Sequence, residues 1–172
     1  MRESVKNLRK CNCSIVDDQP GYYFWWFKET CVKKILAPLP NIDYSRHISD
    51  GKGFVKLYVG IASREALRER ALWHICQKHS ASSVKHGTLS TLRQTLSALL
   101  GINMSQSEQM VNDFMDKYCE WEWHPTNTGA EAEAIEKEEL FRNYFPLNIK
   151  DNKVVDPETI NKLKELRKEY KQ

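Results

Sequence analysis

The sequence predicts an α+β protein, because three segments that favour strands are interspersed with segments that have the spacing of helices. Its 172 residues correspond to one domain with a long insertion or tail. The first strand segment is the aromatic run at residues 21–27, and the second spans residues 54–60. The third, at residues 119–124, alternates polar and apolar residues as a half-buried strand does.

Five further segments have the apolar spacing and the end signals of helices. Ser63 and Asp156 are placed to cap two of them at the N-terminus, and Gly101 is a natural C-terminal stop for a third. The expected helices comprise residues 64–78, 89–100, 107–117, 128–143 and 157–172. We expect the Ser/Thr-rich stretch between the first two, residues 80–87, to be a loop.

These elements divide the chain into three parts. Residues 1–19 are polar and are expected to form an arm or a short helix before the core. Residues 20–150 form the main domain, with a hairpin insertion at 28–53 and a helical insertion at 80–117. Residues 151–172 form a helical appendage.

The composition is that of a globular protein without a membrane span. The chain is 41% hydrophobic and 28% charged, and no apolar run reaches the roughly 18–20 residues that a spanning helix needs. The N-terminal residues lack the apolar core of a secretory signal, so we expect a cytoplasmic protein whose five cysteines are thiols. Cys11, Cys13 and Cys31 can also be read as three zinc ligands, but no fourth ligand completes that set.

Charge is distributed unevenly along the chain, although the formal net charge is only +3. Residues 52–100 carry eight Lys or Arg against two Glu, a net of +6, whereas residues 101–140 carry ten Asp or Glu against two Lys, a net of −8. A basic block beside an acidic one indicates a face that binds a polyanion, with carboxylates available for a metal or for solvent.

Four short patterns contain residues suited to cleaving a phosphodiester bond. They are G-Y-Y at 21–23, Y-V-G at 58–60, L-R-E-R followed by a histidine within 67–74, and a glutamate-rich segment followed by P-L-N at 146–148. Tyr23 and Tyr58 would lie on one sheet, and Arg70 and His74 share a helix face because they are four residues apart. A phenol and an imidazole can pass a proton from water, a guanidinium can hold a phosphate, and a carboxylate can hold a divalent metal.

This set resembles the motifs of the GIY-YIG nuclease superfamily. The resemblance rests on the four patterns in this order and on the twelve-residue spacing from Glu136 to Asn148, and it covers about residues 20–150. It implies a small three-stranded antiparallel sheet flanked by helices, with residues 121–123 in the third strand. It also implies an endonuclease that acts on DNA with Mg²⁺ or Mn²⁺.

The resemblance assigns roles to the residues that match its first three motifs. Tyr23 would be the phenol beside the attacking water, and Tyr58 would orient the phosphate or a metal-bound water. Arg70 would bind the scissile phosphate, and His74 would take up the proton. Arg68 is the alternative arginine, but it lies about 200° around the helix from Arg70 and does not pair with His74.

The last motif supplies the expected metal ligand. Glu136 would be the single ligand, and Asn148 would tie the site together by hydrogen bonds. Glu133 and Glu139 each lie about one turn from Glu136 on a similar helix face, so either can take its place in this assignment.

Residues 80–100 have no role in the minimal family core, so we expect this insertion to contact DNA. The same segment has a leucine stripe that fits a structural helix, and the two roles can occupy different faces. The expected DNA-contacting residues are Arg68, Lys78, His79, Lys85, His86 and Arg93.

The sequence thus predicts a metal-dependent DNA endonuclease of a restriction-like or mobile-element type. Cutting both strands would need a homodimer or successive nicking. The alternative is a nucleic-acid-binding module on the same fold that has no catalytic activity.

Overall fold

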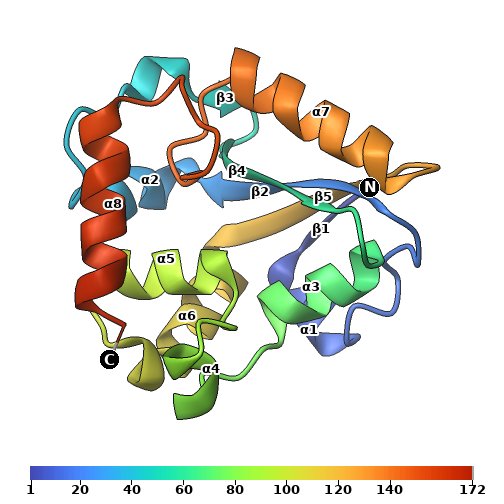
Figure 1. Ribbon diagram of the computed structural model, residues 1–172, viewed down its shortest axis with the longest axis horizontal. Coiled ribbons are helices and arrows are strands. Elements are labelled where there is room, and N and C mark those ends of the chain that lie inside the picture. The colour runs from blue at the N-terminus through green and yellow to red at the C-terminus, as the bar shows by residue number, and fades with distance from the viewer. Residues whose placement is uncertain (172) are drawn as a thin grey trace.

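The computed structural model describes residues 1–171 and contains one five-stranded antiparallel sheet covered by helices (Figure 1). The strand order is β1-β5-β2-β4-β3. The strands are β1 (Arg2–Ser4), β2 (Gly21–Lys28), β3 (Ile48–Ser49), β4 (Phe54–Ala62) and β5 (Cys119–Pro125). The expected α+β class is confirmed, and β2, β4 and β5 are the three expected strands.

The expectation of a three-stranded sheet is wrong, because two short strands extend it at its edges. β1 pairs with β5, and β3 pairs with β4 only at Lys56 and Val55. Strands of three and two residues are too short to show an alternating pattern in the sequence. Because β3 is so short, the outer edge of β4 is left without a partner strand beyond Lys56.

The central strand β2 brings the two predicted tyrosines onto one face. Tyr23 lies opposite Gly60, and Trp25 lies opposite Tyr58. Residues that are opposite each other in an antiparallel pair point to the same face, so Tyr23 and Tyr58 are diagonal neighbours. The register shifts between Trp25 and Trp26, where Leu57 of β4 is the extra residue of a β-bulge.

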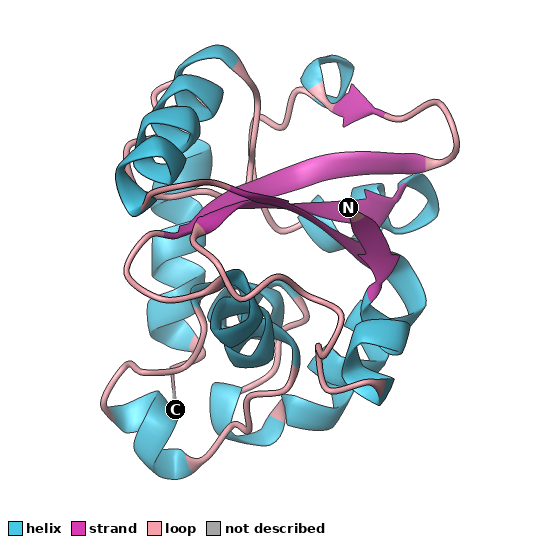
Figure 2. Ribbon diagram, turned by 90° about the vertical axis from the view of Figure 1, so that its right-hand side faces the viewer, coloured by secondary structure: helices cyan, strands magenta, loops and turns pink. Residues whose placement is uncertain are grey.

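The helices cover both faces of the sheet, and Figure 2 shows the sheet between two helical layers. On one face α7 packs against β2 and β4, and a small core there contains Phe24, Val59 and Leu140. The larger core lies on the other face. The helices are α1 (Val5–Lys10), α2 (Glu29–Leu36), α3 (Leu67–Ile75), α4 (Ala81–Lys85), α5 (Thr91–Leu99), α6 (Glu108–Tyr118), α7 (Gly129–Arg142) and α8 (Pro157–Glu169).

Most expected helices are present with shifted ends. α3 begins after Ala66 instead of Ser63, so it is shorter than the expected 64–78. The short helix α4 occupies the stretch expected to be a loop, and α2 lies inside the expected hairpin insertion. α8 begins after its Asp156 cap as expected, and residue 172 of that prediction lies outside the described residues. Within residues 1–171, no helix has both the length and the apolar character needed to cross a bilayer.

The first ten residues contribute two side chains to the core. Val5 and Leu8 of α1 are fully buried in the larger core. The Met1 ammonium donates to the carbonyl of Trp123 at 2.8 Å, so the chain start is tied to β5. The segment that we expected to be an arm or a short helix therefore supplies an edge strand and a buried helix.

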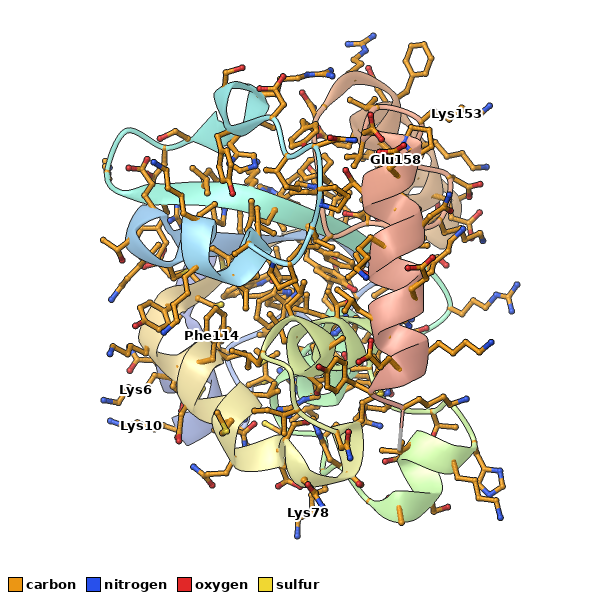
Figure 3. The ribbon with its side chains drawn as sticks, turned by 90° about the vertical axis from the view of Figure 1, so that its left-hand side faces the viewer. Lys6, Lys10, Lys78, Phe114, Lys153 and Glu158 are labelled. Carbon is orange, nitrogen blue, oxygen red and sulfur yellow. The ribbon has the colours of Figure 1, made fainter. Side chains whose placement is uncertain are left out.

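We expect Leu8→Ala to lower the free energy of unfolding by about 2–5 kcal/mol, because it leaves a cavity in the core. Urea denaturation measures the change. Lys6→Ala is the matched control on the same helix, since Lys6 is exposed and points away from the body in Figure 3. Equal urea midpoints for the two variants would contradict the packing of this segment.

Candidate active site

A cavity of about 400 Å³ brings together residues from all four motifs. It is lined by Tyr23, Tyr58, Arg70, Glu136 and Asn148, which come from β2, β4, α3, α7 and the loop after α7. The cavity includes Gly60 and Ile61 of β4. Five of the six expected catalytic side chains therefore line one space, although they are up to 125 residues apart in the sequence.

The sixth, His74, lies directly behind Tyr23. The Tyr23 hydroxyl is 2.6 Å from Nε2 of His74, and Nδ1 of His74 is 2.6 Å from the Ser90 hydroxyl. Burial raises the pKa of Tyr23 well above its ordinary value. Burial lowers the pKa of His74 well below its ordinary value, and the charges of Arg70 and Arg93 lower it further. Near pH 7 both side chains are therefore neutral, and a proton can pass between them.

Of the two candidate arginines, Arg70 lines the cavity. Its guanidinium forms an ion pair with Glu65, and its Cζ atom lies 4.7 Å from the centre of the Trp73 ring. Arg68 points elsewhere, because it donates to the carbonyls of Val16 at 3.1 Å and Ser14 at 3.0 Å. Arg68 thus holds the N-terminal loop, and of the two candidates only Arg70 is in position to bind a phosphate in the cavity.

Glu136 is the only one of the three candidate glutamates that lines the cavity. Glu133 is exposed, and the Glu139 carboxylate accepts a hydrogen bond from Asn143 at 2.8 Å. Burial raises the pKa of Glu136, and the nearby Asp151 and Glu133 charges raise it further, while Lys150 and Arg70 oppose them. A half-buried carboxylate that is costly to ionise gains from a bound cation.

Asn148 closes the free edge of β4. Its Oδ1 accepts from the Val59 amide at 3.0 Å, and its Nδ2 donates to the Val59 carbonyl at 2.8 Å. The amide of Leu147 also donates to the carbonyl of Leu57 at 3.1 Å. Through these hydrogen bonds, residues 147–148 take the place of a partner strand along β4. They also fix the segment after α7 beside Tyr58.

Two expected DNA contacts are interior groups. Arg93 is fully buried and His79 is 5% exposed. Arg93 donates from Nε to the His74 carbonyl at 2.6 Å and from Nη2 to Asn112 at 2.8 Å, while its Nη1 donates to Nε2 of His79 at 3.1 Å. We therefore correct the expectation for these two residues, because neither has surface to offer a nucleic acid. Arg93 instead satisfies carbonyls at the end of α3, and His79 accepts a hydrogen bond from Arg93.

The remaining expected DNA contacts lie outside the cavity. Lys78, Lys85 and His86 are exposed, and Arg68 is partly buried. Their contact with DNA stays a prediction.

The chain matches the family model described as the GIY-YIG catalytic domain over residues 21–169. The chain belongs to the GIY-YIG catalytic domain family. This family assignment indicates nuclease activity. The match also extends past residue 150, where our sequence-based resemblance ended, and it includes α8. Comparison with curated proteins gave no match, and comparison with solved structures gave none.

The donor set of this GIY-YIG site fits a hard divalent cation. Glu136 is joined by Asp151 at the cavity wall, and both offer carboxylate oxygens. No group of three or more His, Cys, Asp or Glu side chains that could hold a metal occurs in residues 1–171. Mg²⁺ commonly binds one or two carboxylates and retains several waters, so it does not need a cage of protein ligands. The zinc reading of Cys11, Cys13 and Cys31 gains no support, because all three are free thiols outside any such group.

Several residues of the GIY-YIG site were not predicted from the sequence. Ser90 holds His74, and Thr91 Oγ1 lies 3.3 Å from the Tyr58 hydroxyl. Lys150 and Arg167 also line the cavity. Ser90 and Thr91 lie near the start of a predicted helix, directly after a polar stretch. Hydroxyl residues at that place are a signal for a helix cap. Arg167 had no signal, because it is one of several charged residues on the polar positions of an amphipathic helix.

Gly60 of the second motif is required by the position of Tyr23. A Cβ atom at residue 60 would lie less than 3.0 Å from the hydroxyl oxygen and two ring carbons of Tyr23. The Tyr23 ring is held by its contact with His74 and is 2% exposed, so it has little room to move. Glycine at this position therefore allows the Tyr23–His74 contact.

We expect Gly60→Ala to reduce DNA cleavage by about 10²–10⁴-fold, the usual contribution of a proton-transfer group. Initial cleavage rates and thermal unfolding would be measured together, since overpacking also costs about 1–3 kcal/mol of stability. Tyr23→Phe alone and combined with Gly60→Ala completes a double-mutant cycle. Fully additive effects would show that Gly60 acts independently of Tyr23.

The buried neutral His74 predicts a loss of stability in acid. Its folded pKa lies below the unfolded value of about 6.5, so the unfolded state binds the proton first and stability falls as the pH drops below about 6.5. One such proton contributes a slope of up to about 1.4 kcal/mol per pH unit. Urea denaturation of wild type and His74→Gln between pH 7.5 and about 5 isolates this contribution. The slopes of the unfolding free energy against pH should differ between the two proteins by up to this amount. Parallel curves would rule out a contribution from His74.

Proposed function

We propose that this protein is a metal-dependent endonuclease that hydrolyses phosphodiester bonds in DNA. The observation that supports this most directly is the single cavity shared by Tyr23, Tyr58, Arg70, Glu136 and Asn148, with His74 hydrogen-bonded to Tyr23. Together these side chains provide a phosphate-binding cation, a proton relay and a carboxylate.

The proton relay runs from water through Tyr23 to His74. The Tyr23 oxygen accepts a proton from the attacking water while its own proton passes to Nε2 of His74, 2.6 Å away. His74 can accept it because the imidazole is neutral at pH 7. The tautomer with a proton on Nδ1 donates to Ser90, which leaves Nε2 free to accept.

Arg70 binds the scissile phosphate in this mechanism. Its charge disfavours the protonated form of His74 when the cavity contains no anion. A phosphate bound to Arg70 offsets that charge, so His74 becomes more basic when substrate is present. The substrate thereby helps to activate the group that accepts its proton.

Glu136 would hold the metal, with Asp151 beside it on the cavity wall. A bound Mg²⁺ or Mn²⁺ supplies a Lewis acid for the negative charge that develops on the leaving oxygen. Because Glu136 is half-buried, a cation bound there would lie inside the cavity. Its attraction for the charge on the leaving oxygen would be stronger there than in water.

We expect Glu136→Gln and Arg70→Ala each to reduce cleavage of supercoiled plasmid by at least about 100-fold, because each removes one charged group of the site. Glu133→Gln and Arg64→Ala are matched controls, since both residues are exposed neighbours on the same or an adjoining segment. Cleavage would be measured with Mg²⁺ or Mn²⁺, and with EDTA.

Activity that survives in Glu136→Gln, or in EDTA, would refute Glu136 as the metal ligand. No cleavage by wild type, with salt-sensitive DNA binding retained, would replace the nuclease with a non-catalytic DNA-binding module.

A further inference from the structure

A second arginine reaches the catalytic cavity from the C-terminal helix. Arg167 of α8 lines the cavity together with Tyr58 and Arg70. Its Nη2 donates to Oε1 of Gln94 on α5 at 2.7 Å, which directs the side chain inward. Figure 1 shows α8 running along one side of the molecule and passing α5. α8 therefore contributes a cation to a site that is otherwise lined by the sheet, α3, α5, α7 and the loop after α7.

The charge of Arg167 has no counterion in the part of the chain that the structure describes. Arg70 is paired with Glu65, but no described carboxylate lies within 4.0 Å of the Arg167 guanidinium. The Arg167 side chain is partly buried beside the cavity, and this burial lowers its pKa. A poorly solvated cation without a partner gains stability from a bound anion.

A second hollow continues from the cavity along α8. It has a volume of about 430 Å³ and shares Ile149 and Asp151 with the cavity. Its lining includes Lys153 from the loop before α8 and Lys164 from α8 itself. Lys164 is three residues before Arg167, so both lie on one face of the helix.

The two lysines of this hollow are also available for an anion. Neither forms an ion pair within residues 1–171. Figure 3 shows Lys153 extending into solvent near Glu158 at the start of α8. The Glu158 carboxylate is engaged by Asn41 at 2.8 Å. Three cations without an ion pair in residues 1–171 thus line the cavity and the adjoining hollow: Arg167 the cavity, and Lys153 and Lys164 the hollow.

We propose that α8 and the loop before it bind the DNA backbone, with Arg167 on a phosphate inside the cavity and Lys153 and Lys164 on phosphates further along the same strand. This inference rests on the proposed function, because the anion that enters the cavity is the substrate. A guanidinium can bind two phosphate oxygens at once, whereas a lysine acts as a mobile point charge. Arg167 would therefore hold one phosphate in a fixed position near the reaction, and the two lysines would make looser contacts with phosphates farther away.

The test measures DNA binding without cleavage. Binding of a duplex of about 20 base pairs would be titrated in EDTA at several salt concentrations, using Glu136→Gln as the parent. Each phosphate contact contributes about 0.9 to the slope of log K against log salt. Arg167→Gln should weaken binding about tenfold and make the slope less negative by about 0.9. Lys153→Gln with Lys164→Gln should change the slope by about twice that amount.

Two variants control for charge and folding. Lys168→Gln removes an exposed charge from the same helix outside both hollows, so the binding slope should stay close to that of the parent. Arg167→Lys keeps the charge, so it should retain the slope while binding more weakly. Thermal unfolding confirms that each variant is folded. If Arg167→Gln does not fold, the double variant Lys153→Gln with Lys164→Gln provides the loss-of-charge test on its own.

The outcomes separate this inference from the proposed function. Equal slopes and affinities for Arg167→Gln, Lys168→Gln and the parent would overturn the α8 surface even if wild type cleaves DNA. Slopes that depend on Arg167 in a protein whose wild type does not cleave would support the surface and overturn the nuclease.

Discussion

The hydrogen bond between Tyr23 and His74 is the constraint on which the site depends. A fully buried histidine needs a partner at each ring nitrogen, because an unpaired polar group in the interior is costly. Tyr23 satisfies Nε2 and Ser90 satisfies Nδ1. Gly60 leaves room for the tyrosine ring. The position of the Tyr23–His74 pair is thus set by three separate parts of the chain.

The helical insertion has a structural role in this arrangement. Ser90 is the N-cap of α5, so the same hydroxyl begins a helix and holds the histidine. Arg93, one turn later, binds the carbonyl of His74, and Arg9 of α1 binds the carbonyl of Ile75. These two cations compensate the negative end of α3. The helix that carries Arg70 and His74 is therefore fixed at its C-terminal end by segments that lie far from it in the sequence.

The elements that could be predicted from the sequence are those with a recognisable residue pattern over several positions. β2 and β5 carry aromatic or alternating residues over seven or more positions, but β1 and β3 exist only because they pair with longer neighbours. Arg70 could be separated from Arg68 because helix geometry sends the two side chains in different directions. The role of Arg93 could not be predicted, because a basic residue that binds buried carbonyls looks the same in a sequence as one that binds DNA. α2 was missed although Cys31, Val32, Ile35 and Leu36 follow a helical period, since the segment was assigned to a hairpin.

Burial is the main reason why Tyr23 and His74 are neutral in the free site, and the positive charges around the cavity add to this effect for His74. Arg70 is partly neutralised by Glu65, whereas Arg167 keeps its full charge beside Tyr58. Burial lowers the pKa of His74, and the charges of Arg70 and Arg93 lower it further. In the proposed mechanism, a phosphate diester would bring negative charge to the arginines, and a divalent cation would bring positive charge to Glu136. Each ligand would therefore lower the electrostatic cost of binding the other, and His74 would become more basic when the phosphate is in place.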